Sequence, residues 1–129
     1  MSDSSNSEKK LDQLLTQIGN APESVEFNQV IDVIHACYDY TPTRFTNGKN
    51  DSTVINEAGS NEGSCKIFSF AQLQKLDKEK TLNCFGDYYR KDVLQNPDGS
   101  DHGNIRNFIR SGWAGISFDG QALKIKSSD

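Results

Sequence analysis

Two apolar stripes at helical spacing, separated by a proline break, constrain the fold of this chain more than any other feature. Side chains three and four residues apart lie on one face of a helix, so each stripe predicts an amphipathic helix with one buried side. The first helix is expected from Glu8 to Ile18, with Ser7 as its N-cap and Gly19 in the left-handed position after its end. Its stripe consists of Leu11, Leu14, Leu15 and Ile18.

The second helix follows the break at Ala21–Pro22, and Ser24 is its expected N-cap. Its stripe consists of Phe27, Val30, Ile31, Ile34 and Tyr38. Pro42 disfavours helical backbone at the residue before it, so this helix should end between Tyr38 and Tyr40.

The middle of the chain predicts two short strands and a third helix. Residues 44–46 and 52–55 flank the turn signal Asn47–Gly48 at a separation too long for a tight two-residue hairpin. We therefore expect a looser pair of strands. From residue 64 or 65 to about residue 76 the apolar spacing favours a helix. A strand over residues 66–70 is the alternative, because the apolar run is short.

The later part of the chain predicts a long helix that ends in a turn. The helix covers residues 78–95, although Gly86 in its middle costs about 1 kcal/mol relative to alanine. The turn is Asn96–Pro97–Asp98–Gly99, a sequence in which each residue favours non-helical backbone.

A shorter helix is expected over residues 102–110, and residues 100–101 supply its N-cap, as Ser100 or Asp101. Gly112 fits the position just past its end. Trp113 should then fold back onto Phe108, which is the apolar contact that such helix ends make.

The C-terminal segment predicts a β-hairpin. Asp119–Gly120 lies between two apolar segments, and Asp-Gly favours two-residue hairpin turns because both positions need positive φ. This register pairs Ile116 with Leu123 on one face. Together the elements predict an α+β fold, a mostly helical single domain with a small antiparallel sheet and a C-terminal hairpin. The domain is expected over residues 8–129, after a polar, Ser-rich, disordered tail at residues 1–7.

The composition argues against several classes of function. The chain has 129 residues and a formal net charge of −4, and no run of Lys or Arg marks a surface for nucleic acid. No apolar run approaches the roughly 20 residues that span a bilayer, so we expect a soluble protein with no membrane segment. The start of the chain shows no Sec signal peptide. The three cysteines, Cys37, Cys65 and Cys84, are odd in number and indicate free thiols in a reducing cytosol.

Two patterns resemble ligand-binding loops without matching them. Gly59 and Gly63 are separated by three residues where a phosphate-binding loop needs four, so we favour a structural turn. Residues 98–104 offer oxygen ligands but lack the alternating acids and final Glu of a calcium loop. The chain also has too few closely spaced His and Cys for zinc, so no metal site and no cofactor are predicted.

Cys65 is the candidate nucleophile. At a helix start beside Lys66 it is expected to have a lowered thiol pKa, and His102 with Asp101 or Asp98 is the best available base and orienting acid. The alternative is a small buried thiol in the core, which is also the reading of the other two cysteines.

A cluster of aromatic and cationic side chains suggests a binding surface. Arg106 and Arg110 lie four residues apart, so both can face one side of their helix and hold a carboxylate or phosphate. Tyr beside Arg also suits a protein interface. We expect the last two helices to lie side by side, with Tyr89, His102 and Arg106 around one hollow. The alternative is a solvated face on which the arginines pair with aspartates. The candidate ligand-binding residues are Tyr88, Tyr89, Arg90, Asp101, His102, Arg106 and Arg110.

Several segments combine residues in unusual ways, namely Tyr38–Gly48, Asn56–Gly59, Asn61–Phe68, Thr81–Arg90, Asp101–Arg106 and Gly112–Trp113. On these segments the chain resembles the HopJ type III effector protein family over about residues 25–125. The family name comes from effectors that plant-pathogenic bacteria inject into hosts, and similar small proteins occur in free-living bacteria. The resemblance implies a bacterial protein, either cytoplasmic or secreted into a host cell by a type III system. It implies no activity, cofactor or catalytic residue.

From these observations we expect a binding module for a protein partner or a small anionic ligand. One alternative is a small enzyme that uses Cys65 or His102 with an aspartate. Another is a bacterial housekeeping protein that is not secreted.

Overall fold

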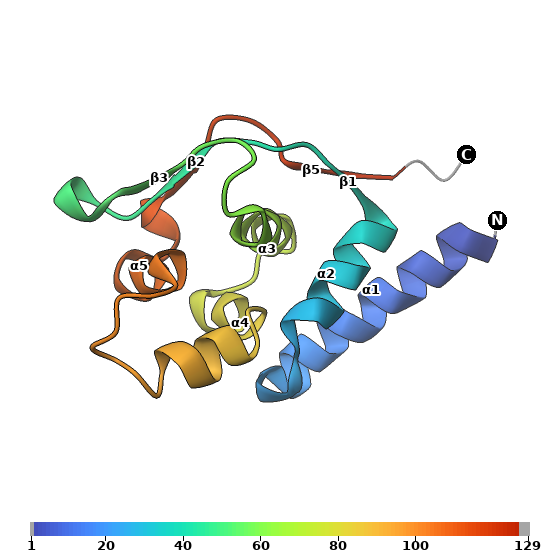
Figure 1. The fold of residues 1–129 in the computed structure, drawn as a ribbon. Coiled ribbons are helices and arrows are strands. Elements are labelled where there is room, and N and C mark those ends of the chain that lie inside the picture. Colours follow the sequence, from blue (N-terminus) through green and yellow to red (C-terminus); the bar gives the residue numbers. More distant parts are fainter. Residues whose placement is uncertain (1, 127–129) are drawn as a thin grey trace.

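The computed structural model describes residues 2–126, in which short strands lie along one edge of a mostly helical body (Figure 1). The helices α1 and α2 lie side by side and antiparallel (Figure 1). The predicted α+β class and the mostly helical single domain are confirmed. The helices are α1 (Ser2–Asn20), α2 (Phe27–Cys37), α3 (Glu62–Leu73), α4 (Lys78–Asn83) and α5 (Gly103–Ser111). Shorter turns are η1 (Pro22–Ser24), η2 (Asn50–Ser52), the π-helical η3 (Tyr88–Val93) and η4 (Gly112–Gly115).

The strands form two small antiparallel sheets. One has the order β3-β2-β4 and the other pairs β1 with β5. The predicted pair of strands around Asn47–Gly48 is confirmed as β2 and β3, with Thr46 opposite Ile55. The strands are β1 (Tyr38–Tyr40), β2 (Phe45–Asn47), β3 (Val54–Asn56), β4 (Ile116–Phe118) and β5 (Leu123–Ile125).

The predicted C-terminal hairpin is wrong in its pairing. Both strands exist, but Ile116 pairs with Asn47 and Leu123 pairs with Tyr40, so the segment crosses from one sheet to the other. A lone two-stranded hairpin is marginal in water. In β4, Phe118 instead stacks on the buried Phe45 at 5.0 Å between ring centroids, and it gains an aromatic contact that a local hairpin does not offer.

The core centres on Phe68 of α3. Its ring lies 5.3 Å from Phe85, which follows α4, and 4.9 Å from Phe108 of α5. The predicted end of α5 is confirmed, because Gly112 has φ 60° and Trp113 packs against Phe108 at 5.0 Å. The predicted third helix is likewise confirmed as α3, so the alternative strand is excluded. The core therefore joins α3, the residues after α4, and α5 through one aromatic cluster.

The long helix predicted over residues 78–95 is broken at Gly86. This residue has φ +62°, and a Cβ there would lie 2.7 Å from the backbone nitrogen of Phe27. The close approach of the start of α2 therefore requires glycine in a left-handed conformation, which interrupts the helix. The chain continues as η3, which places Tyr88 beside Phe27.

Three predicted N-caps are also wrong. The first helix begins at Ser2 rather than Glu8, and Ser7 bonds to α2, with its hydroxyl donating to the Ala36 carbonyl at 3.2 Å. The second helix begins after Glu26, whose reciprocal capping with Gln29 replaces the predicted Ser24 cap. The last helix begins at Gly103, one residue from the predicted start, but His102 takes the N-cap position in place of Ser100 or Asp101. Disorder of residues 1–7 stays a prediction, and Met1 lies outside the described residues.

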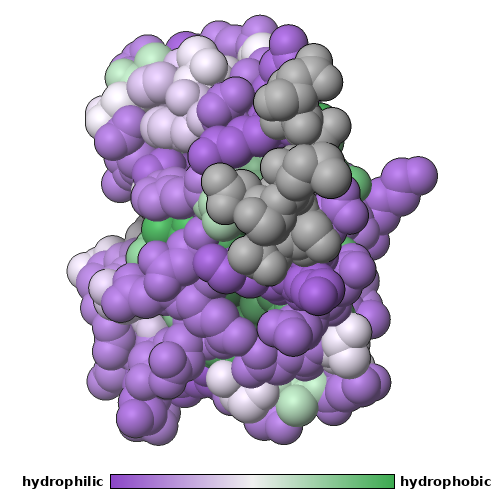
Figure 2. Space-filling view, turned by 90° about the vertical axis from the view of Figure 1, so that its right-hand side faces the viewer, coloured by the Kyte–Doolittle hydropathy of each residue, from purple (hydrophilic) through white to green (hydrophobic). Residues whose placement is uncertain are grey.

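The face that carries α1, α2 and the two ends is mostly hydrophilic, with hydrophobic residues visible mainly in its hollows (Figure 2). Polar residues on the outer side and apolar residues inside agree with the amphipathic pattern of α1. Among the helices of residues 2–126, none has the length and apolarity that a bilayer crossing requires.

Candidate functional site

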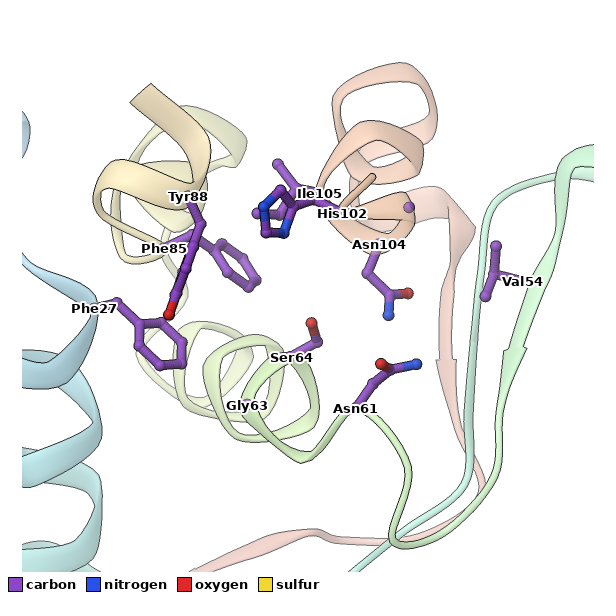
Figure 3. Close-up of a pocket in the computed structure, with 11 residues that line it drawn as sticks. Phe27, Val54, Asn61, Gly63, Ser64, Phe85, Tyr88, His102, Asn104 and Ile105 are labelled. Atoms are coloured by element: carbon purple, nitrogen blue, oxygen red, sulfur yellow. The ribbon is translucent and has the colours of Figure 1, made fainter. Parts of the chain in front are cut away.

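A cleft of about 510 Å³ lies between the starts of α3 and α5, with Phe27 and Tyr88 on one side (Figure 3). We call it the Tyr88 cleft. Two turns far apart in the sequence, around Ser64 and around His102, face each other across it. Its lining residues are Phe27, Val54, Asn61, Gly63, Ser64, Phe85, Tyr88, His102, Gly103, Asn104 and Ile105.

One wall of the Tyr88 cleft is aromatic. The Tyr88 ring stands edge-on to Phe27 at 5.1 Å and lies 5.3 Å from the imidazole of His102. Tyr88 is 45% exposed, whereas the other large aromatic side chains of residues 2–126 are buried or half-buried. A half-exposed ring that is fixed by two aromatic neighbours offers a flat apolar surface for stacking.

Two uncapped helix starts, which face each other across the cleft, complete its lining. Asn61 before α3 and His102 before α5 both have left-handed backbone, with φ 50° and 53°, and neither side chain caps its helix. The N–H groups of Gly63, Ser64 and Asn104 donate no hydrogen bond to other residues in the part of the chain that the structure describes. Free N–H groups at a helix start carry partial positive charge and attract anions.

The Ser64 hydroxyl adds a further polar group, because it points into the space between the two helix starts (Figure 3). The Asn61 and Asn104 side chains flank the same space, and both are tied to Asn56 in the sheet. All three asparagines lie within the segments that carry the family resemblance, but that resemblance assigns them no role, and none of the ligand-binding motifs contains the set.

His102 is half-buried at the edge of the cleft. Its Nε2 lies 3.0 Å from Asp92 Oδ2 and 3.7 Å from Asp101 Oδ2. The predicted proximity of His102 to an aspartate is therefore present, and Asp92 is the nearer partner. Because Asp92 occupies Nε2, that nitrogen is not free for an anionic ligand.

Comparison with known proteins places this chain. The model of the HopJ type III effector protein family matches residues 11–123. The chain belongs to this family. It is also similar to a chain in a crystal structure described as that of unknown function protein VPA0580, with 50% identity and a TM-score of 0.86. That similarity covers 90% of this chain and 93% of the other. No curated protein matches the chain.

In this HopJ-family protein Arg106 does not reach the Tyr88 cleft. It is buried and bonds to the loop before α5, with Nε 2.6 Å from the Asp101 carbonyl and Nη2 2.7 Å from Asp101 Oδ1. Nη1 bonds to the carbonyls of Asn96 and Pro97. The hydrogen bond from Arg106 holds the pKa of Asp101 below its ordinary value. Arg106 and Arg110 line a separate hollow of about 220 Å³, and Arg110 bonds to Asn107.

Arg90 and Tyr89 also have structural roles in the HopJ-family fold. The guanidinium of Arg90 donates to carbonyls of Pro22, Val25 and Asn83, which joins η1 to the end of α4. Tyr89 packs against the core, and burial raises its pKa. The expected hollow between Tyr89, His102 and Arg106 is therefore wrong, because Gly86 breaks the helix and presents Tyr88 in place of Tyr89.

The thiol of Cys65 is buried, and its sulfur lies 3.6 Å from the Thr43 carbonyl, outside the lining of the Tyr88 cleft. Burial raises its pKa, so the expected lowering by the helix start and Lys66 is wrong. The other two thiols are also buried, as predicted, and burial raises the pKa of Cys84 to about 12. Among the described residues no three His, Cys, Asp or Glu side chains gather as metal ligands would.

Proposed function

We propose that this HopJ-family protein is a binding module that takes a small ligand, composed of a flat ring and an anionic group, into the Tyr88 cleft. The observation that carries the proposal is the placement of unpaired backbone donors at Gly63, Ser64 and Asn104 across from the exposed ring of Tyr88. The cleft volume of about 510 Å³ is that of a small-molecule site.

The two walls select different parts of such a ligand. The ring would stack against Tyr88 and Phe27, where an aromatic pair contributes about 0.5–1.5 kcal/mol beyond the area that it buries. The anionic group would accept hydrogen bonds from the starts of α3 and α5. Hydrogen bonds to a charged group contribute about 1.5–3 kcal/mol each. A ligand with both parts should therefore bind more tightly than a ligand with only one of them.

The negative charges near the cleft limit where the anion can lie. Asp92 and Asp101 both lie beside His102. Repulsion from these carboxylates disfavours an anion at the imidazole. The anionic group is therefore assigned to the space around Ser64, on the opposite wall (Figure 3).

An NMR titration tests the proposal. Phenyl phosphate, inorganic phosphate and benzyl alcohol are added to the ¹⁵N-labelled protein, and amide shifts at Gly63, Ser64 and Asn104 are followed. We expect phenyl phosphate to bind about tenfold or more tightly than the other two, because each of these offers one part only. Equal affinity for inorganic phosphate, or shifts elsewhere in the protein, contradicts the proposal.

Two variants separate binding from folding. Tyr88→Ala should weaken phenyl phosphate binding about tenfold with a small change in stability, because the ring is 45% exposed. Ser64→Ala should weaken it about fivefold by removing one hydrogen bond. Ser60→Ala is the matched control, since Ser60 is exposed in the preceding loop and does not line the cleft.

The family name favours a second candidate, delivery through a type III system. A fusion of residues 1–20 to a reporter enzyme tests it. Transfer of the reporter into host cells by a secretion-competent strain, and its loss in a strain without the system, is the expected result. Retention in both strains favours the housekeeping alternative.

A further inference from the structure

The starts of α3 and α5 are joined through the side chain of one buried residue. Oδ1 of Asn56, in β3, accepts hydrogen bonds from Nδ2 of Asn61 at 2.6 Å and from Nδ2 of Asn104 at 2.8 Å. Asn56 is 1% exposed. A single carboxamide oxygen thus connects the residue before α3 to the first turn of α5.

The same carboxamide is fixed from its other side. Nδ2 of Asn56 donates to Oδ1 of Asn104 at 3.1 Å and to the Phe45 carbonyl at 3.4 Å. Asn47 of β2 donates to Oδ1 of Asn104 at 3.0 Å and to its carbonyl at 2.8 Å. The three buried asparagines form a network anchored in the sheet. Buried networks whose groups are paired hold one arrangement rigidly, and in this one Oδ1 of Asn47 is the buried side-chain atom that lacks a partner among the described residues.

Packing alone does not account for this network. Asparagine is unfavourable in strands, and carboxamides in a core are costly unless they are hydrogen-bonded. The network fixes the positions of the residues that it joins. It reaches the residue before α3 and the first turn of α5, and neither helix has a side-chain cap of its own. Asn61 and Asn104 also line the Tyr88 cleft.

We propose that Asn56 is a positioning residue that couples the two helix starts and so sets the separation of the backbone donors across the Tyr88 cleft. The coupling is a property of the free protein. Only its effect on affinity rests on the proposed function. Without Asn56 the two starts open independently, and a ligand has to order them on binding.

Amide hydrogen exchange in the free protein tests the coupling. The first amides bonded within the two helices are those of Cys65, which donates to the Asn61 carbonyl, and Arg106, which donates to the His102 carbonyl. In Asn56→Ala both amides should exchange about tenfold faster or more, and phenyl phosphate affinity should fall by a similar factor. A faster rate at one helix start only, or at neither, overturns the proposal.

Asn107→Ala is the matched control. Asn107 is also a buried asparagine, and its side chain donates to the carbonyls of Asn47 and Ser52 without touching the two helix starts. Asn107→Ala should lower stability as Asn56→Ala does. The amide exchange rates of Cys65 and Arg106, each divided by the rate of exchange through global unfolding, should stay unchanged. If Asn107→Ala accelerates amide exchange at Cys65 and Arg106 to the same extent, Asn56 acts only as an ordinary core residue.

Asn61→Gly keeps the proposal testable if Asn56→Ala does not fold. Asn61 is exposed and has left-handed backbone, so glycine fits without strain and removes only the bond to Asn56. Exchange at Cys65 should rise and phenyl phosphate affinity should fall, and no change in either contradicts the coupling. If the wild type binds none of the probes while the exchange results hold, the proposed function fails and the coupling stands. If the wild type binds and Asn56→Ala binds equally well, the coupling fails instead.

Discussion

The two faces at the start of α5 differ in how the polar groups around them are used. On one face Arg106 is 6% exposed, and its guanidinium bonds to the carbonyls of residues 96, 97 and 101 and to a carboxylate. On the other face the N–H groups of Gly63, Ser64 and Asn104 donate to no described residue. Strong charge thus marks the structural face, and neutral groups without partners mark the face that can bind.

The difference shows why charge in a sequence is a poor guide to a site in this fold. A guanidinium has five donors in a fixed geometry and can close a loop by itself. Arg106 and Arg90 both do so, and no donor set remains for a ligand in the cleft. A helix start without a cap, in contrast, keeps its donors free whatever the charge of its residues.

Replacing Arg106 is the largest test of the structural face. Arg106→Met keeps much of the side-chain volume but leaves the loop carbonyls of residues 96–101 without their donor. We expect a loss of about 3 kcal/mol in the free energy of unfolding, measured by urea denaturation. Arg110→Met, whose side chain is exposed, should stay within about 0.5 kcal/mol.

The decrease of stability at low pH gives an independent measure of the ion pair between Arg106 and Asp101. Arg106 lowers the pKa of Asp101 in the folded state, so this contribution is present above the ordinary carboxyl pKa of about 4 and is lost as pH falls through the folded value. In Arg106→Met that part of the pH dependence should disappear. Unchanged stability together with loss of phenyl phosphate binding would reverse our assignment of the two faces.

Local features of the fold were predictable because few residues decide them. Gly112 and Trp113 terminate α5 as expected, since a left-handed glycine and an apolar contact suffice. The local sequence predicts only a small penalty for Gly86 within a helix, because its close approach to Phe27 involves a segment about sixty residues away in the chain. The pairing of β4 with β2 is decided in the same way, by the stacking of Phe118 on Phe45.

The candidate site could be predicted only in part, because it also depends on contacts between residues far apart in the chain. Tyr88 and His102 were among the proposed residues, and the structure brings them together. Ser64 directly follows Gly63, in the loop that the spacing of its glycines led us to favour as a structural turn. Asn104 owes its role to a buried network, which has no signature in the spacing of residue types.

The thiols offer a second test, because the burial of Cys84 places it with the structural groups. Its ordinary thiol pKa of 9.0 rises to about 12 in the folded protein. The raised value means that the folded state keeps the proton, so stability is fully present below pH 9.0 and is lost as pH rises toward about 12. We expect a loss of about 2–3 kcal/mol by pH 11, at about 1.4 kcal/mol per pH unit.

The measurement is urea unfolding between pH 8 and pH 11 for the wild type and for Cys84→Ala. The variant should be less stable at pH 8 but should lose less stability as pH rises. Parallel curves for the two proteins contradict the assignment. Rapid labelling of Cys65 by a thiol reagent at neutral pH would also return that residue to the candidate nucleophiles.

Gly86→Ala tests the close contact between Gly86 and the start of α2, on which both stability and the aromatic wall depend. A Cβ at this position meets the Phe27 nitrogen at 2.7 Å and has to adopt φ +62°, so we expect a loss of about 2 kcal/mol in the free energy of unfolding. Because Phe27 forms part of the aromatic wall, the shift should also weaken phenyl phosphate binding. An unchanged melting temperature would indicate that α2 can move away from η3 without cost.

Gly103→Ala has the smallest expected effect on stability and separates the two faces most sharply. Gly103 lines the Tyr88 cleft, and an added Cβ meets nothing within 4 Å. Its φ is not positive, so alanine fits the first position of α5 and should change the free energy of unfolding by no more than about 0.5 kcal/mol. The methyl group enters space that a ligand needs, so phenyl phosphate affinity should fall severalfold while urea unfolding is unaffected. Because Gly86→Ala should reduce stability and binding together, a variant that reduces binding alone shows that the groups around the cleft are free for a ligand and are not required by the fold. A Gly103→Ala protein with wild-type affinity would place the ligand away from the start of α5, and the anionic group would then depend on α3 alone.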